Sequence, residues 1–302
     1  GDHFNTVLWT GNATADRAIT GVGFQPDMLW IKNRGATEGH KLVDGVRGAT
    51  KYIVPNNTDA EATDSDMVTS FDSDGFTIGA QASVNQDTKA IVGWSWLGAN
   101  STVTNTDGTN IDSTVSANTT AGFSICTYTG TGDAADSFGH GLTEAPTWLV
   151  VKRLDSADGW NVGTTAPGLS FANFFYLNTD DSKSTYEHMW NNTNPTATVV
   201  TLGLDGGTNL DTGKYVAYCF HSVEGYSKIG SYTGNGTYPD GVFIYTGFRP
   251  AWLMIKRISS GVDATGIGWQ MGDNKRDTYN VVNNALQANT TGAENDEPGP
   301  DV

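Results

Sequence analysis

The sequence predicts an all-β protein made of tandem antiparallel β-sandwich units, of the jelly-roll or lectin-like type. Three observations favour this fold class. One apolar run recurs three times along the 302 residues, strand-length apolar runs alternate with turns rich in Asn, Asp and Gly, and few segments have helical spacing. We therefore expect helix in less than roughly a tenth of the chain, whereas globular proteins average about a third.

The repeated run keeps the same landmarks in each copy. It reads GFQPDMLWIKNR, TEAPTWLVVKR and GFRPAWLMIKR, with a leucine three residues after the proline and a lysine three residues after the leucine. The leucines are Leu29, Leu149 and Leu253, and the lysines are Lys32, Lys152 and Lys256. The glycine of a Thr-Gly pair lies 15 or 16 residues before each proline. Such repetition indicates copies of one structural unit.

The distance between the copies suits small sandwich domains. The Thr-Gly glycines lie 119 and 104 residues apart, which is too long for a solenoid turn but right for a small β-sandwich. We expect unit 1 over residues 1–97, unit 2 over residues 122–224 and an incomplete unit 3 over residues 225–302, because the aromatic closing segments VGWSW and VAYCF have no third copy. Residues 98–121, rich in Thr, Ser and Asn, are either a partly ordered linker or an added edge hairpin.

Units that share a fold should place matching residues alike. We expect Leu29 and Leu149 at equivalent buried positions, and Trp94 and Tyr218 at a second pair of equivalent positions. Residues 40–53 have the best helical spacing in the chain, but glycines interrupt it, so this stretch is predicted as one short helix or a loop.

Composition limits the classes of partner. The formal net charge of −16 argues against nucleic acid, which requires clustered Lys and Arg. No apolar run is long enough to span a membrane, so a membrane partner is not expected either. Cys126 and Cys219 lie in apolar segments and are expected to be small buried side chains, which could form a disulfide only if their strands are neighbours.

The acidic residues raise the question of calcium. Asp72 and Asp74 lie in the segment DSDG, and Asp205 and Asp211 lie in and just after LDGGTN. Neither pair has the spacing of an EF-hand loop. Turn formation explains these aspartates without a metal, so no cofactor is expected and structural calcium is the alternative.

Catalytic motifs are missing from the sequence. It lacks the phosphate-binding GxxxxGK[ST] loop, the GxSxG nucleophile elbow and the HExxH zinc motif. The five histidines are scattered, and His140, which lies between two glycines, is expected to be structural. We therefore predict no enzyme activity, although any two of the 33 acidic residues could form the carboxylate pair of a glycosidase.

Carbohydrate is the ligand class that the aromatic residues favour. An aromatic ring covers the C–H groups of a sugar while neighbouring polar groups bond its hydroxyls. The candidates for such contacts are Trp190, Tyr186, His188, Trp160 and Trp269. Trp160 and Trp269 hold similar places in units 2 and 3, which favours a core position for these two.

Several motifs carry a family resemblance. The segments TSFDSDGFTIG, TAGFSICTYTGTG and IYTGFRPAWLMIKR, together with the three proline-led runs, resemble a repeat family found in marine phage genomes. Its members are treated as tail or other virion proteins of unknown function, and the similarity extends along nearly the whole chain. The resemblance implies a structural and adhesive virion protein, part of a tail, fibre or surface decoration, that contacts host glycans. It supplies no catalytic residues.

Two other functions stay open, namely a glycan depolymerase built on a β-scaffold and a purely architectural virion protein. The resemblance also implies other virion subunits as partners. Together with the unfinished third unit, whose apolar strand edges need a cover, it favours a homo-oligomer, with a trimer preferred if the chain belongs to a fibre.

Overall fold

The computed structural model describes residues 1–237, 240–259, 268–280 and 282–296. Its regular elements are almost all strands, which confirms the all-β prediction. The helices in these residues are single turns, α1 (Ala82–Asn85), α2 (Glu187–Trp190) and α3 (Gly206–Asn209). Among the same residues, no helix has the length and apolar character needed to cross a membrane.

Unit 1 is a sandwich of two antiparallel sheets. Its main sheet has the strand order β1-β9-β3-β4-β5-β6, and its small sheet has the order β2-β8-β7. The main strands are β1 (Phe4–Thr10), β9 (Ala90–Trp96), β3 (Met28–Asn33), β4 (Lys41–Asp44), β5 (Lys51–Ile53) and β6 (Ala62–Thr63). The small strands are β2 (Arg17–Thr20), β8 (Gly75–Ile78) and β7 (Val68–Asp72). Leu29 of the main sheet and Phe76 of the small sheet belong to one core between the two sheets.

Unit 2 repeats this arrangement and adds strands to it. Its main sheet has the order β10-β12-β13-β20-β15-β16-β17-β18, and its small sheet has the order β11-β14-β19. The main strands are β10 (Val103–Asn105), β12 (Ser113–Asn118), β13 (Phe123–Thr129), β20 (Lys214–Phe220), β15 (Trp148–Arg153), β16 (Trp160–Thr164), β17 (Asn173–Tyr176) and β18 (Ser184–Thr185). The small strands are β11 (Asn110–Ile111), β14 (Ser137–Gly139) and β19 (Val199–Thr201). Residues 98–121 thus contain the antiparallel pair β10 and β12, and β12 is added to the edge of β13.

The predicted equivalence of units 1 and 2 is confirmed for the landmark residues. From β13 to β18 the strand order of unit 2 is the order of β1 to β6 in unit 1. Leu29 pairs with Ser95 of β9, Leu149 pairs with Cys219 of β20, and both leucines are fully buried. Trp94 and Tyr218 are also equivalent, because each pairs with the residue that directly follows the leucine, Trp30 in unit 1 and Val150 in unit 2.

Unit 3 contains the second half of the same main sheet. Its described strands have the order β21-β22-β23-β24, which matches β3 to β6 and β15 to β18. They are β21 (Trp252–Ile255), β22 (Gln270–Asp273), β23 (Asn284–Gln287) and β24 (Asn295–Asp296).

The prediction of a short helix or loop at residues 40–53 is wrong. This stretch forms β4 and β5, joined by a turn. Leu42 and Val43 are neighbours in the sequence, yet they are buried in different cores on opposite faces of the main sheet. Such burial on both faces is typical of a central strand, and it produced an apolar pattern that resembled helical spacing.

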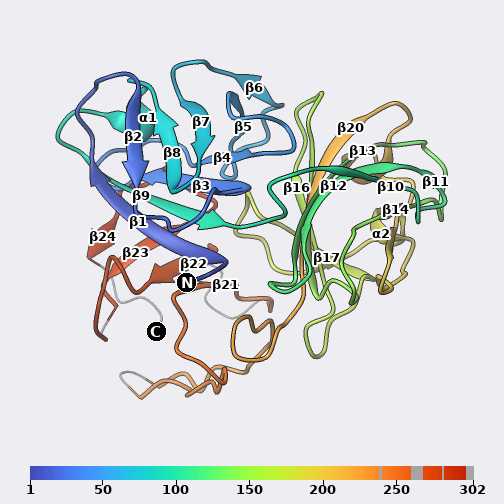
Figure 1. Ribbon diagram of the computed structural model, residues 1–302. Coiled ribbons are helices and arrows are strands. Elements are labelled where there is room, and N and C mark those ends of the chain that lie inside the picture. Colours follow the sequence, from blue (N-terminus) through green and yellow to red (C-terminus); the bar gives the residue numbers. More distant parts are fainter. Residues whose placement is uncertain (238–239, 260–267, 281, 297–302) are drawn as a thin grey trace.

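The three units surround a common core. One face of each main sheet contributes to it, through residues such as Trp94 in unit 1, Tyr218 in unit 2 and Met271 in unit 3. In Figure 1, the blue and cyan strands of unit 1 lie beside the green and yellow strands of unit 2 and above the red strands of unit 3. Units 1 and 2 therefore bury their main sheets twice, once within each sandwich and once between the units.

Candidate functional site

Two of the predicted ligand-binding aromatics, Trp160 and Trp269, lie at junctions between units. The Trp160 Nε1 of unit 2 donates to the backbone oxygen of Val54 in unit 1 at 3.1 Å. The Trp269 Nε1 of unit 3 donates to the backbone oxygen of Tyr176 in unit 2 at 3.0 Å. Both indoles are buried, so the structure assigns them to packing between units, and neither offers a ring face to a sugar.

The third junction has a histidine in the same place. His40 comes just before β4 and lies eight residues after Lys32, as Trp160 lies eight residues after Lys152. Its Nδ1 accepts from the Trp30 indole at 2.9 Å, and its Nε2 donates to the backbone oxygen of Gln287 in unit 3 at 3.0 Å. Unit 2 thus contacts unit 1, unit 3 contacts unit 2 and unit 1 contacts unit 3, so the three units form a closed ring.

The repeated lysines link the same neighbours. Each Nζ donates to a backbone oxygen of the adjoining unit. The residue that supplies this oxygen comes four positions after the residue whose backbone oxygen accepts from the indole or imidazole. The pairs are Lys32 with Thr291 at 3.3 Å, Lys152 with Thr58 at 3.3 Å and Lys256 with Asp180 at 2.6 Å. Burial lowers the pKa of Lys32 and of Lys152 to about 8. The lysine recurs in the sequence because it fastens one unit to the next.

Buried ion pairs add further contacts at two of the junctions. Arg47 Nε lies 2.6 Å from Asp44 Oδ2, and Tyr218 of unit 2 donates its hydroxyl to the same oxygen at 2.6 Å. In unit 3 the corresponding carboxylate is Asp273. These two carboxylates lie opposite Met28 and Trp252, the matching first residues of β3 and β21.

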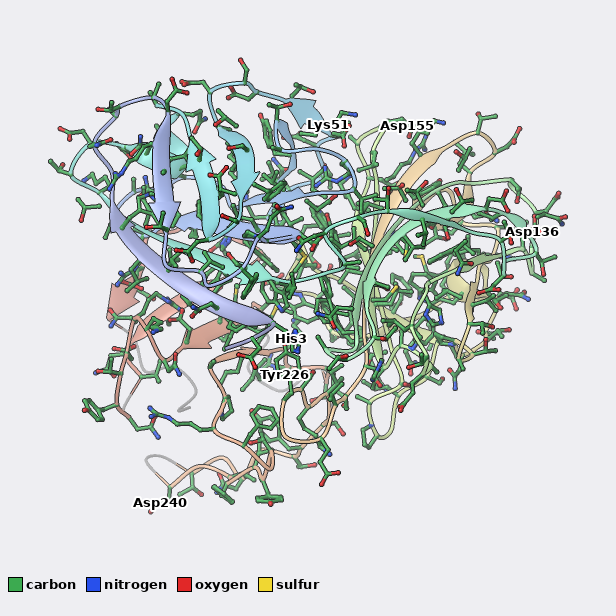
Figure 2. All side chains as sticks on the ribbon, in the orientation of Figure 1. His3, Lys51, Asp136, Asp155, Tyr226 and Asp240 are labelled. Carbon is green, nitrogen blue, oxygen red and sulfur yellow. The ribbon has the colours of Figure 1, made fainter. Side chains whose placement is uncertain are left out.

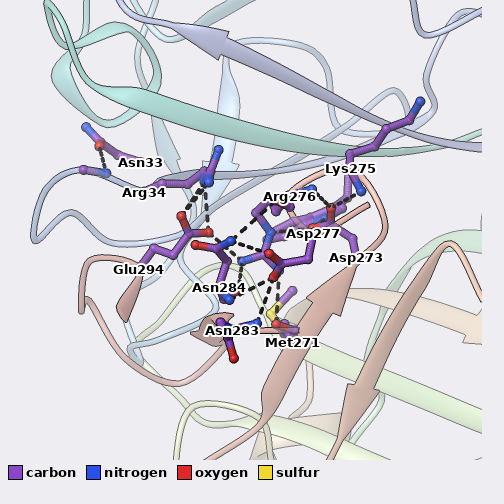
Figure 3. A network of polar contacts seen from close by, with 12 residues as sticks. Asn33, Arg34, Met271, Asp273, Lys275, Arg276, Asp277, Asn283, Asn284 and Glu294 are labelled. Atoms are coloured by element: carbon purple, nitrogen blue, oxygen red, sulfur yellow. Dashed lines mark hydrogen bonds and ion pairs between the residues drawn. The ribbon is translucent and has the colours of Figure 1, made fainter. Parts of the chain in front are cut away.

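Figure 3 shows the pair in unit 3 as part of a longer network. Arg276 Nε lies 2.5 Å from Asp273 Oδ2, and the Trp94 indole of unit 1 donates to that oxygen at 3.0 Å. Glu294 Oε1 accepts from Arg276 Nη1 at 2.9 Å and from Nε of Arg34 in unit 1 at 3.0 Å. Units 1 and 3 are therefore joined by charged groups as well as by apolar packing.

Acid should destabilise the fold through two buried histidines, of which His40 lies at a junction of the ring and His140 lies within unit 2. Burial lowers the pKa of His40 to about 3 and that of His140 to about 4, whereas an unfolded histidine titrates near 6.5. Below about pH 6.5 the unfolded chain therefore binds protons that the folded chain does not. The free energy of unfolding consequently decreases as the pH is lowered. We expect each of these two histidines to lower the free energy of unfolding by about 2 kcal/mol between pH 7 and pH 5, as measured by urea unfolding.

A variant separates the share of His40 from that of other groups. His40→Gln should reduce the loss of stability between pH 7 and pH 5 by about 2 kcal/mol. His188→Gln is the matched control, because it removes an imidazole whose side chain is partly exposed, at 43%. Equal pH profiles for the wild type and His40→Gln would contradict the prediction.

The other predicted aromatic cluster is divided between core and surface. Trp190 is fully buried between the sheets of unit 2 and packs edge-on against Phe171, with ring centroids 5.3 Å apart. Tyr186 is 43% exposed, and its ring contacts that of His188 at 5.2 Å. Trp190 thus belongs to packing, and Tyr186 and His188 remain at the surface.

The calcium candidates Asp72, Asp74 and Asp205 bond groups of their own turns or of nearby loops. Asp72 accepts from Ser70 and Thr77, Asp74 accepts from the backbone N–H groups of Gly21 and Gly23, and Asp205 caps α3 through the N–H of Gly207. Asp211 is exposed. In the residues that the structure describes, no three His, Cys, Asp or Glu side chains gather as a metal site would require.

The two cysteines lie on neighbouring strands, and both are free thiols. β13 and β20 pair so that Cys126 is opposite Ala217 and Cys219 is opposite Ser124. Burial raises the pKa of the Cys219 thiol, which keeps it protonated and unreactive. The disulfide alternative is therefore not adopted.

An exposed apolar segment distinguishes unit 3. Residues 242–245 read Val-Phe-Ile-Tyr, and Phe243 and Tyr245 are 86% and 79% exposed. This part of the chain runs along the lower edge of Figure 1, apart from the labelled strands, and Asp240 marks it in Figure 2. Soluble proteins rarely expose a run of large apolar side chains that has no binding role.

The repeat relates this segment to the small sheet. Residues 242–245 hold the places of residues 138–141, which begin within β14, and Val242 holds the place of Phe138. β14 pairs with β19, and its Phe138 is fully buried. In the part of unit 3 that the structure describes, no strand pairs with residues 242–245.

The main sheet of unit 3 also has an open edge. β3 lies between β9 and β4, and β15 lies between β20 and β16, but among the described strands β21 pairs with β22 alone. Leu253 is accordingly only partly buried, whereas Leu29 and Leu149 are fully buried. The candidate site is therefore the surface made of the β21 edge and residues 242–245. Sequence reasoning did not find it, although the apolar run GVFIYTG was a visible signal.

Comparison with known proteins assigns a family to this chain. The model of a family described as a domain of unknown function, DUF7483, matches residues 1–301. The chain belongs to the DUF7483 family. One family model thus spans all three units of the ring. No curated protein and no solved structure matches the chain.

Proposed function

We propose that the chain is a structural and adhesive component of a phage particle, such as part of a tail, fibre or surface decoration. The observation that carries this proposal is the surface of unit 3 made of the β21 edge and residues 242–245. Apolar side chains are exposed there, whereas the junctions of the ring are buried. The closed ring suits a rigid scaffold, because each unit is held to both of its neighbours through backbone oxygens that accept buried donors.

Binding rather than catalysis is favoured by how the polar side chains are used. His40 and His140 each have both ring nitrogens engaged in the fold. The Tyr186 and His188 pair is the surface feature that supports contact with host glycans, since a ring face with polar neighbours suits a sugar. The glycan role is therefore secondary to assembly in this proposal.

A glycan depolymerase is the second candidate, and one observation favours it. The Oδ1 atoms of Asp158 and Asp205 both lie within 3.2 Å of the position that a Cβ on Gly207 would occupy. Two carboxyl groups so near each other occur in glycosidases. Shortening of host polysaccharide by the purified chain, abolished in Asp205→Asn with folding intact, would place the enzyme first.

The assembly proposal predicts that the chain self-associates through its exposed segment. The double variant Phe243→Ser, Tyr245→Ser should remove concentration-dependent association in analytical ultracentrifugation, because apolar burial drives such contacts. Its urea midpoint should not change, since both side chains are exposed. Tyr279→Ser is the matched control, because Tyr279 is 80% exposed but lies outside the segment. A wild-type chain that stays monomeric at every concentration and does not bind particles would overturn the proposal.

A further inference from the structure

The two occupied main sheets specify what a strand beside β21 must look like. Along β9, the residues opposite β3 read Val-Gly-Trp-Ser-Trp, and along β20 the residues opposite β15 read Val-Ala-Tyr-Cys-Phe. Both therefore follow valine, small, aromatic, small, aromatic. The aromatic residues of both strands contribute to or pack against the common core, whereas Cys219 faces the core of its own sandwich.

We propose that the open edge of β21 is an acceptor site for an extended polypeptide strand of this pattern, bound antiparallel in the register of β9 and β20. The inference deepens the proposed function, on which it rests, because it names the partner's chemistry. In this register a small residue is opposite Leu253 and an aromatic residue is opposite Met254. Backbone hydrogen bonds would supply affinity, and the alternating side chains would supply selectivity.

Part of the site is already formed. The Trp252 ring packs edge-on against Trp96 of unit 1, with centroids 5.4 Å apart, but its buried indole nitrogen has no hydrogen-bond partner. In unit 2 the matching residue, Trp148, packs against Phe220, the last aromatic of the β20 pattern, at 5.4 Å. The last aromatic of an added strand would meet Trp252 in the same way.

The aromatic residue at the third position of the pattern, which is Trp94 in β9 and Tyr218 in β20, also has a contact available in unit 2. Tyr218 bonds Asp44 of unit 1 and Trp94 bonds Asp273 of unit 3, so this position contacts the adjoining unit in both occupied copies. Thr164 of unit 2 holds the place of these aspartates, opposite the first residue of β15. An added strand would complete the third such contact around the ring.

A second region of unit 3 points to the same missing strand. Residues 227–233 correspond to β13, since both precede the Thr-Gly glycine by the same distance. β13 is held by β20 on one side, yet residues 227–233 form no strand. A strand beside β21 would provide these residues with the neighbour that β20 is to β13.

A peptide supplied in trans tests the proposal. We would add the β9 sequence AIVGWSW, with lysines at its amino end for solubility, and follow amide hydrogen exchange by mass spectrometry. Exchange should slow at least tenfold at β21 and at residues 227–233. The control peptide AIVGSSS, which keeps the length and the small residues, should produce no protection. A β20 copy with serine for cysteine should act like the β9 peptide.

Three results would overturn the proposal: no protection by either active peptide, equal protection by the control peptide, or β21 amides already as protected as those of β15 in the free chain. The test uses no residue of the 242–245 segment. Loss of self-association in the Phe243→Ser, Tyr245→Ser variant and binding of the peptide are therefore separate readouts, and failure of the strand site can be told from failure of the proposed function.

Discussion

Trp160→Ala should lower the free energy of unfolding by about 3–5 kcal/mol, as expected when a fully buried tryptophan is removed. The loss has two parts. The indole fills the common core, and its Nε1 donates to the backbone oxygens of Val54 and Asn57 in unit 1, which would be left without that donor. Urea unfolding at pH 7, followed by circular dichroism, measures the total.

Trp190→Ala is the matched control for this variant. Trp190 is also fully buried, but it lies within unit 2 and makes no hydrogen bond through its indole nitrogen. Both variants should lose similar stability, and neither loss should reflect a lost ligand. Only Trp160→Ala should speed amide exchange in residues 54–57 of unit 1. Equal exchange in the two variants would show that Trp160 does not hold the junction.

Asp273→Ala should cost about 3 kcal/mol, because it leaves Arg276 buried without its closest carboxylate. Neither side chain of this pair is exposed to solvent. Glu294 still accepts from Arg276, which places the expected loss at the lower end of the range for broken buried pairs. The Trp94 indole of unit 1 also loses its acceptor, so the junction between units 1 and 3 should be the part that loosens.

The double variant Asp273→Ala, Arg276→Met distinguishes a charge effect from a packing effect. Removing both charges should recover part of the loss, since it leaves no Arg276 charge buried without its carboxylate. If the double variant is less stable than Asp273→Ala alone, the charge interpretation is wrong. Urea midpoints of the three proteins decide between the two.

The sequence was sufficient to predict features that depend on short-range pattern. Leu29 and Leu149 were placed correctly because strand alternation and the repeat agree at those positions. Trp160 and Trp269 could be recognised as packing residues because a position repeated between units serves the fold more often than a ligand. The small residues and turns between strands were equally visible.

The ring could not be predicted, for a physical reason. The acceptors at each junction are backbone oxygens, which every residue has, so Val54, Tyr176 and Gln287 leave no signature in the sequence. The third donor is hard to recognise in the sequence, because it is His40 whereas the other two units have a tryptophan at this position. Its distance from Lys32 was the available signal, and it becomes meaningful only when the lysine is known to lie at a junction.

The closed ring also has a meaning for the origin of this chain. Every junction joins the same two surfaces head to tail, and unit 2 carries both of them, with Trp160 as donor and Tyr176 as acceptor. Such a heterologous contact closes when its rotation divides the circle evenly. Three separate copies of one such unit could therefore make the same junctions as a homotrimer, and this chain holds the three units in a single polypeptide. Each copy could then diverge on its own, as the exchange of tryptophan for His40 illustrates.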